Sequence, residues 1–121
     1  MAKAGSESQP RGRRYASLRG RNAFQKVFRT GIRRRSGGVT VIVGSGAPGP
    51  PRVGVVAGAK EVGSAVQRNR AKRRLREVLV GIPLQDGCDY VVIASQSVLT
   101  APFGEVEGWL RRVVGEETQD G

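Results

Sequence analysis

The chain has 121 residues, of which 21 are Lys or Arg and 10 are Asp or Glu, so that its formal net charge is +11. This length predicts one domain, and no apolar run is long enough to predict a membrane span or a secretory signal. The lack of histidine removes the commonest general base and metal ligand, and the single Cys88 excludes an internal disulfide and is typical of a reducing cytoplasm.

The ends of the chain predict disorder on either side of one domain. Residues 1–14 are polar, rich in Gly and Ser, and turn basic at Arg11, Arg13 and Arg14, which predicts a disordered basic arm. A single α/β domain is expected over residues 15–115. The acidic and polar residues 116–121 predict a disordered tail.

The first element expected is a short helix over residues 22–30. Asn22 and Gln25 have the spacing of a capping box. Apolar side chains then recur at helical spacing: Phe24, Val27 and Phe28. Gly31 is expected to end the helix.

Two β-branched runs, residues 39–43 and 52–57, predict strands. Residues 45–51 between them are rich in Gly and Pro and predict a loop. We therefore expect the two strands to lie side by side, joined by a hairpin-like connection.

The clearest helix prediction covers residues 64–80. Ser64 and Gln67 form a second capping-box pattern, and Gly81 and Pro83 end the helix. Its apolar stripe is expected to comprise Ala71, Leu75, Val78, Leu79 and Ile82.

The last strand expected is a buried one over residues 90–94, and Cys88 at its start is expected to be a small buried residue. A final helix is expected after a turn at residues 100–102. One face of that helix is expected to carry Phe103, Val106, Leu110 and Val113. The order helix, strand, strand, helix, strand, helix predicts an α+β sandwich with helices packed on a small sheet.

Charge is distributed unevenly along the chain. No acidic residue lies between Ser8 and Lys60, and the helix over residues 64–80 carries six positive charges in nine residues, opposed by Glu77 alone. At 100° per residue, one face of this helix carries Asn69, Lys72, Arg73 and Arg76. Like charges at this spacing repel, so we expect an external polyanion to neutralise them; the alternative is a solvated basic face.

Two further features leave alternatives open. Phe24 and Phe28 lie one turn apart between basic flanks, so they either stack on single-stranded bases or pack in the core. Glu61 and Glu77 are expected to form local ion pairs, and no group of carboxylates has the spacing of a metal site. We therefore expect no catalytic residue in the chain.

Residues 67–77, Gln-Arg-Asn-Arg-Ala-Lys-Arg-Arg-Leu-Arg-Glu, closely resemble the signature helix of the bacterial ribonuclease P protein family. Residues 23–29 followed by Gly31, and residues 52–54 leading through Lys60 and Gly63 to the helix, match in order and spacing. With weaker similarity over residues 89–94, the resemblance covers roughly residues 18–114.

The resemblance implies a three-layer sandwich, ribosomal protein S5 domain 2-like, with a left-handed β-α-β crossover around the signature helix, against the usual right-handed rule. It also implies a cytoplasmic subunit of a ribonucleoprotein, one protein per RNA, that removes the 5′ leader of precursor tRNA. The RNA would carry the chemistry with Mg²⁺ that it binds itself.

The resemblance also implies site residues. Those that bind the catalytic RNA would be Arg68, Asn69, Arg70, Lys72, Arg73 and Arg76. Those that bind the leader would be Phe24, Phe28, Lys60, Arg19 and Arg21.

The sequence departs from the family at several positions, including Ser64, where Asn is common among relatives, and a connection to the signature helix that is one residue longer. The first strand lacks the aromatic residue that many relatives direct at the leader, and Lys60 is followed by Glu61 where relatives tend to have paired lysines.

Two other functions remain as alternatives to a ribonuclease P subunit: a structural RNA-binding protein, such as a ribosomal or assembly factor, and a protein-only nuclease. The missing histidine argues against the nuclease.

Overall fold

The computed structural model describes residues 15–120, with side chains for residues 15–114, so the predicted basic arm lies outside the described residues. The strands are β2 (Ala16–Ser17), β3 (Ile32–Ser36), β4 (Val39–Ser45), β5 (Arg52–Val56) and β6 (Cys88–Ala94). The helices are α2 (Arg21–Thr30), α3 (Ala65–Leu79), α4 (Ser97–Thr100) and α5 (Phe103–Asp120).

The five strands form one mixed sheet in the order β2-β5-β6-β4-β3. β6 pairs parallel with β5 and antiparallel with β4. The prediction that the strands now seen as β4 and β5 are neighbours is therefore wrong, because β6 lies between them. A Gly- and Pro-rich loop can join two neighbouring strands or two strands that are separated by a third. The sequence of the loop does not distinguish these cases, because the third strand, β6, comes later in the chain.

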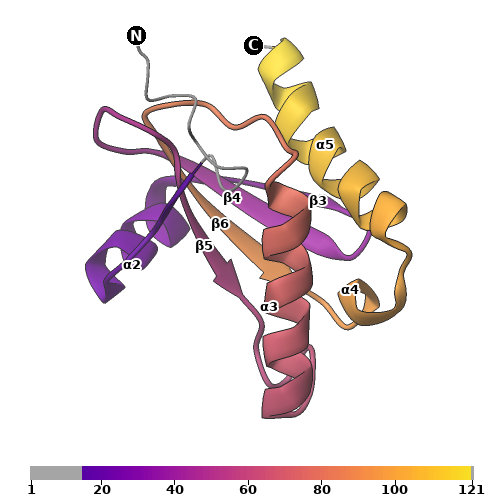
Figure 1. Cartoon of the computed structure of the whole chain (residues 1–121). Coiled ribbons are helices and arrows are strands. Elements are labelled where there is room, and N and C mark those ends of the chain that lie inside the picture. The colour runs from indigo at the N-terminus through magenta and orange to yellow at the C-terminus, as the bar shows by residue number, and fades with distance from the viewer. Residues whose placement is uncertain (1–14, 121) are drawn as a thin grey trace, which may run out of the picture.

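The helices cover both faces of the sheet and produce three layers (Figure 1). α2 packs on one face, against β4 and β6, while α3 and α5 pack on the other. The chain passes from β5 through α3 to the parallel neighbour β6 in the left-handed sense (Figure 1). The α+β sandwich, its three layers and this crossover are the predicted fold.

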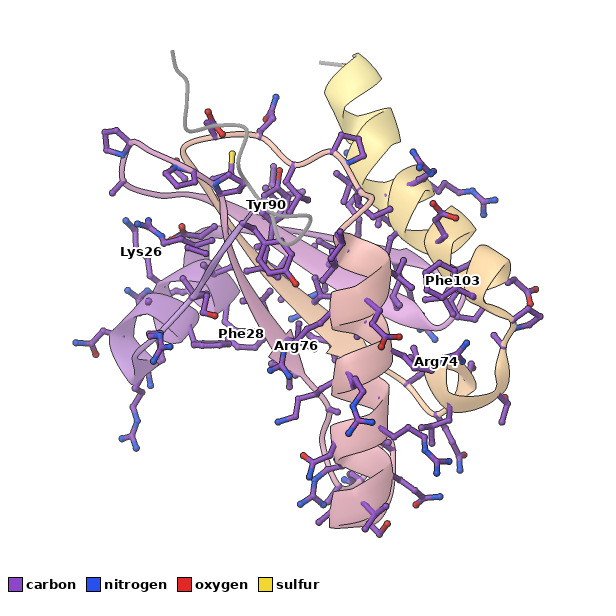
Figure 2. All side chains as sticks on the ribbon, viewed as in Figure 1. Lys26, Phe28, Arg74, Arg76, Tyr90 and Phe103 are labelled. Atoms are coloured by element: carbon purple, nitrogen blue, oxygen red, sulfur yellow. The ribbon has the colours of Figure 1, made fainter. Side chains whose placement is uncertain are left out.

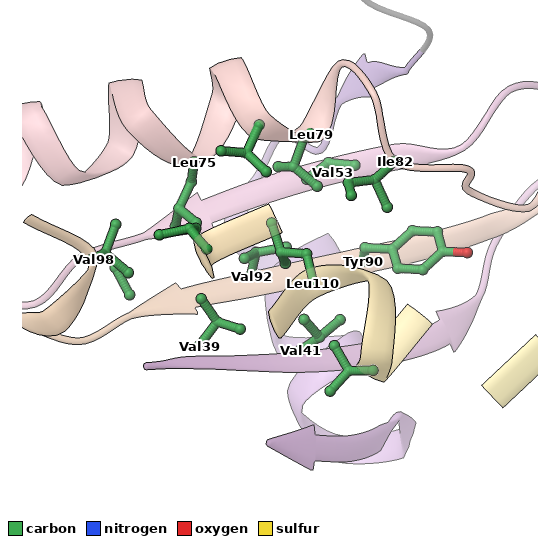
Figure 3. Close-up of a cluster of buried hydrophobic side chains, with 14 of the residues drawn as sticks. Val39, Val41, Val53, Leu75, Leu79, Ile82, Tyr90, Val92, Val98 and Leu110 are labelled. Atoms are coloured by element: carbon green, nitrogen blue, oxygen red, sulfur yellow. The ribbon is translucent and has the colours of Figure 1, made fainter. Parts of the chain in front are cut away.

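The larger core lies between the sheet and the pair α3 and α5 (Figure 3). The apolar stripe predicted for α3 is confirmed at Ala71, Leu75, Val78 and Leu79, and Ile82 is buried just beyond the end of the helix. Each fully buried Val or Leu stabilises the fold by about 1.5–3 kcal/mol. In α5, Val106, Leu110 and Val113 are buried as predicted, but Phe103 is 48% exposed and does not belong to the core face.

Phe103 is exposed because it is the first residue of α5, immediately after the turn at Ala101 and Pro102. The side chains that face the sheet begin one turn later, at Val106. Helical spacing alone does not show where along a helix the contact with the sheet begins.

The two predicted capping boxes have different outcomes. At α3, the Ser64 hydroxyl accepts a hydrogen bond from the Gln67 N–H, and the Gln67 side chain accepts one from the Ser64 N–H, so this box is confirmed. At α2, the cap is Gly20, with a φ of 93° and no side-chain hydrogen bond, so the cap predicted at Asn22 is wrong. Gly20 directs the chain into α2 through a backbone conformation that other residues avoid.

Three elements were not predicted: the two-residue strand β2, the edge strand β3 and the single-turn helix α4. In β3, three consecutive arginines, Arg33, Arg34 and Arg35, conceal the alternation that marks a strand. Charged residues are common on edge strands because they prevent pairing with other sheets.

The helix α5 extends to Asp120 and so includes most of residues 116–121, for which the sequence predicted a disordered tail. None of the helices within residues 15–120 combines the length and the apolar character needed to cross a membrane.

Candidate nucleic-acid interface

The exposed face of α3 is a continuous basic surface. Asn69, Arg70, Arg73 and Arg76 are exposed, and Lys72 is half-buried. None of these four cations forms an ion pair with another residue of the described part of the chain. Because unpaired like charges within one or two turns repel, this face favours binding to an anion outside the chain. We call these five residues the α3 basic face.

Two arginines of α3 lie apart from this face. Arg68 is half-buried, and its Nη1 donates a hydrogen bond to the Gly63 carbonyl at 3.0 Å. Arg74 Nη1 donates to the carbonyls of Val98 at 2.7 Å and Ala101 at 2.8 Å. Figure 2 shows Arg74 directed from α3 toward α4, and Arg76 leaving the helix on the other side.

These contacts give the two arginines structural roles. Arg74, which was not among the predicted RNA-binding residues, connects α3 to α4. Arg68, which it did assign, holds the loop before α3, although part of its side chain stays accessible.

The structure distinguishes between Phe24 and Phe28, which the sequence could not. Phe24 packs on the smaller core of Leu18, Val27, Ile42 and Val91, between α2 and the sheet. Its ring lies directly over Gly54, where a Cβ atom would overlap it. Phe28 is 42% exposed. Phe28 is therefore the aromatic ring available for stacking, and Phe24 holds α2 on the sheet.

A groove lies on the sheet face that α2 covers only in part. Arg35, Thr40 and Ile93 occupy neighbouring positions on β3, β4 and β6, where Arg35 pairs with Thr40 and Thr40 with Ile93. Together with Gly38, Glu61, Ala94 and Ser95 they line a cavity of about 200 Å³. We call this cavity the sheet groove.

The remaining leader-binding predictions are placed at separate points of the surface. Arg19 and Arg21 are exposed just before and at the start of α2, and Lys60 is exposed in the connection from β5 to α3. Lys60 is adjacent in sequence to Glu61, which borders the sheet groove. Neither Arg19 nor Arg21 is among the residues that line the groove.

The acidic residues behave differently from the prediction. Neither Glu61 nor Glu77 forms an ion pair with another residue within 15–114, so the predicted local pairs are wrong. Asp89 is instead buried in β6, and its Oδ1 lies 2.8 Å from Arg52 Nη2 and 2.9 Å from Arg52 Nε. This pair connects the first residue of β5 to β6, and the residues are adjacent only because the strands pair in parallel.

Among the side chains that the structure describes, residues 15–114, no group of three or more His, Cys, Asp or Glu could bind a metal ion. The half-buried Cys88 starts β6, and its Sγ lies 3.8 Å from Gln85 Oε1. The described residues thus do not fit a protein-bound Mg²⁺ site.

Comparison with known proteins agrees with the motif and the fold. The model of the family described as "Ribonuclease P" matches residues 13–117. The chain belongs to the ribonuclease P protein family. This match covers every described element up to most of α5.

Relatives within the ribonuclease P protein family span most of the chain. A "Ribonuclease P protein component" from Symbiobacterium thermophilum is 45% identical over 93 residues, covering 74% of this chain and 79% of the relative. One from a Synechococcus strain is 36% identical over 103 residues, covering 80% and 77%. The solved ribonuclease P protein from Thermotoga maritima has a TM-score of 0.70 at 27% identity, covering 81% of this chain and 94% of the other.

No sequence motif marks the residues that line the sheet groove. Thr40 and Ile93 were predicted in strands, but no motif marks them, and Arg35 lay in a run with no predicted element. Alternation of side chains would place Thr40 with Ile42 on one face of β4. Only the register between β3, β4 and β6 brings Arg35, Thr40 and Ile93 together.

Proposed function

We propose that the chain is the non-catalytic protein subunit of ribonuclease P, which binds the catalytic RNA through the α3 basic face and the 5′ leader of precursor tRNA beside α2. The single observation that carries the proposal is the α3 basic face, whose cations have no ion-pair partner within the described residues. The family of the chain identifies the RNA that would provide the phosphates.

The α3 basic face fits an RNA backbone by its chemistry. Guanidinium groups bind phosphate through paired, charge-assisted hydrogen bonds. Asn69 lies between Arg68 and Arg70 and offers both a donor and an acceptor. The buried stripe of α3 fixes this face in one orientation, so binding costs little conformational entropy of the backbone.

The sheet groove and Phe28 fit a single strand. An exposed ring can stack on a base whatever its identity, and Phe28 is the exposed aromatic residue of α2. The groove supplies Arg35 for a phosphate and the Thr40 hydroxyl for a hydrogen bond. Lys60, Arg19 and Arg21 would add positive charge around this path. A leader binds here without strong base preference because most of these contacts do not read base edges.

The proposal assigns the cleavage chemistry to RNA. Mg²⁺ in the assembled enzyme would be held by RNA groups, and the cations of the protein would reduce the repulsion between phosphates that Mg²⁺ otherwise screens. We place this assembly in the cytoplasm, with one protein per catalytic RNA.

The test is cleavage of a 5′-extended precursor tRNA at low Mg²⁺ by a bacterial ribonuclease P RNA, with and without the protein, beside the protein alone. We expect cleavage to be stimulated only when RNA and protein are both present. We also expect the assembled enzyme to bind precursor tRNA more tightly than mature tRNA, because only the precursor carries a leader.

Phe28→Ala provides a direct probe of the leader site, and Phe103→Ala is its matched control. Both rings are close to half exposed, but Phe103 lies at the start of α5, outside the proposed leader site. We expect Phe28→Ala to weaken precursor binding about 5- to 150-fold, since one stacked base contributes about 1–3 kcal/mol, and Phe103→Ala to leave it unchanged. Tight, salt-sensitive RNA binding without stimulation of cleavage would instead identify a structural RNA-binding protein.

A further inference from the structure

A second hollow, separate from the sheet groove, lies between the start of α3 and the short helix α4. Its volume is about 490 Å³, within the range of roughly 300–1,000 Å³ that small-ligand sites occupy. It is lined by Gln67 and Arg70 of α3 and by Gln96, Ser97, Leu99 and Thr100 at α4. We call it the α3–α4 hollow.

Arg74 fixes the position of the far wall of this hollow. Its Nη1 donates to the carbonyls of Val98 and Ala101, which belong to α4 and the residue after it. The Val98 side chain, on the same short helix, is fully buried in the larger core. α4 is thus attached to α3 at one end by a charged group and to the core by an apolar one, so the hollow is preformed.

The lining has the chemistry of a site for a nucleotide. Arg70 is exposed and has no ion-pair partner among the described residues. The side chains of Gln96 and Thr100 are exposed and make no hydrogen bond with the described part of the chain. None of the lining residues is acidic, so no carboxylate there would repel a phosphate.

The position of the hollow connects it to the α3 basic face. Arg70 belongs to both, so an RNA backbone bound along α3 would reach the rim of the hollow. The positive end of the α3 dipole also lies at this end of the helix. Unpaired bases, unlike paired ones, can leave the stack and present their edges to amide and hydroxyl groups.

We propose that the α3–α4 hollow receives one unpaired nucleotide of the catalytic RNA, with its phosphate on Arg70 and its sugar or base edge on Gln96 and Thr100. This inference rests on the proposed function, and it extends the RNA interface from α3 to a helix that has no basic residue. It also gives α4 a role in recognition: neutral contacts that add specificity to the electrostatic binding by α3.

The test is the affinity of the full protein for a bacterial ribonuclease P RNA at several salt concentrations. The double variant Gln96→Ala/Thr100→Val removes the neutral contacts and keeps every charge. We expect its affinity to fall about 10- to 30-fold, the loss typical of two hydrogen bonds, with the salt dependence unchanged because no phosphate contact is lost. The matched control Gln85→Ala/Ser45→Ala, at the opposite end of the sheet, should bind like the wild type.

Acylation of RNA 2′-hydroxyl groups locates the nucleotide. We expect one unpaired position to be protected by the wild-type protein and by the control, and to become reactive with Gln96→Ala/Thr100→Val. An affinity within twofold of the wild type, a reduced salt dependence, or an unchanged reactivity pattern would each overturn the proposal. Cleavage stimulation by the wild-type protein is measured in parallel. If the wild-type protein does not stimulate cleavage, the proposed function itself fails. If it does, and Gln96→Ala/Thr100→Val binds RNA like the wild type, only the proposal about the hollow fails.

Discussion

Neighbouring arginines of the signature helix have different physical roles. Arg73 is exposed and unpaired within the described residues, while Arg74 donates to two carbonyls at α4. A hydrogen bond from a charged donor contributes more than a neutral one, and its loss leaves part-buried acceptors unsatisfied. Arg73 is thus expected to contribute to RNA binding and Arg74 to the stability of the fold, although the two residues are adjacent in the sequence.

At this residue scale we expect Arg74→Ala to lower the free energy of unfolding by about 2 kcal/mol, equivalent to a Tm decrease of roughly 10 °C for a domain of this size. Arg73→Ala should change stability by less than about 0.5 kcal/mol but reduce the slope of log affinity for RNA against log salt by about one unit. Thermal melts and salt titrations of both variants measure this. Equal melting temperatures for the two would contradict the structural role of Arg74.

At the scale of elements, α3 depends on its N-terminal cap. Its six positive charges in nine residues disfavour the helix, and its first turn contains no acidic residue to interact with the helix dipole. The reciprocal bonds between Ser64 and Gln67 therefore satisfy backbone N–H groups at an end of the helix that has no acidic side chain to interact with the helix dipole.

We expect Ser64→Ala to destabilise the protein by about 1 kcal/mol. Gln67→Ala should add little to it in the double variant, because both substitutions break the same box. Urea unfolding of the two single variants and the double variant gives the interaction free energy between Ser64 and Gln67. Ser45→Ala, the loss of an exposed hydroxyl at the end of β4, is the control and should be neutral. Full additivity of Ser64→Ala and Gln67→Ala would show that the box does not act as a unit.

At the scale of the whole molecule, the sheet separates two proposed RNA surfaces. α2, with Phe28, packs on one face, and α3 packs on the other (Figure 1). Phe28 and Arg73 thus lie on helices that pack on opposite faces of the sheet, and no hydrogen bond or ion pair within residues 15–114 joins them. Substitutions that are well separated and share no partner usually have additive effects.

We therefore expect Phe28→Ala and Arg73→Ala to act independently. Arg73→Ala should weaken assembly with the catalytic RNA but leave precursor affinity unchanged once the RNA is saturated with protein. Phe28→Ala should weaken precursor binding but leave assembly with the catalytic RNA unchanged. The double variant should show both losses in affinity at the sizes of the single variants, within about 0.5 kcal/mol. Filter binding of protein to RNA, and of precursor tRNA to the assembled enzyme, measures both. Coupling above that level would mean that one RNA contact spans both surfaces.

The sequence by itself determined the features that depend on local spacing. The capping box at Ser64, the apolar stripe from Ala71 to Ile82 and the unbalanced charge of α3 follow from residues within one or two turns of each other. The signature motif is also local, and it indicates the family without reference to the fold. Such features are predictable because helical geometry relates neighbours in the sequence directly to neighbours in space.

Only the tertiary structure decided what depends on pairing between distant segments. β6 separates β4 from β5, which brings Arg52 beside Asp89 and aligns Arg35, Thr40 and Ile93 in the sheet groove. Packing over Gly54 partly buries Phe24, while Phe28 stays exposed, although the two residues have the same chemistry and similar sequence surroundings. Strand order and burial arise from contacts across the whole chain, and no local pattern encodes them.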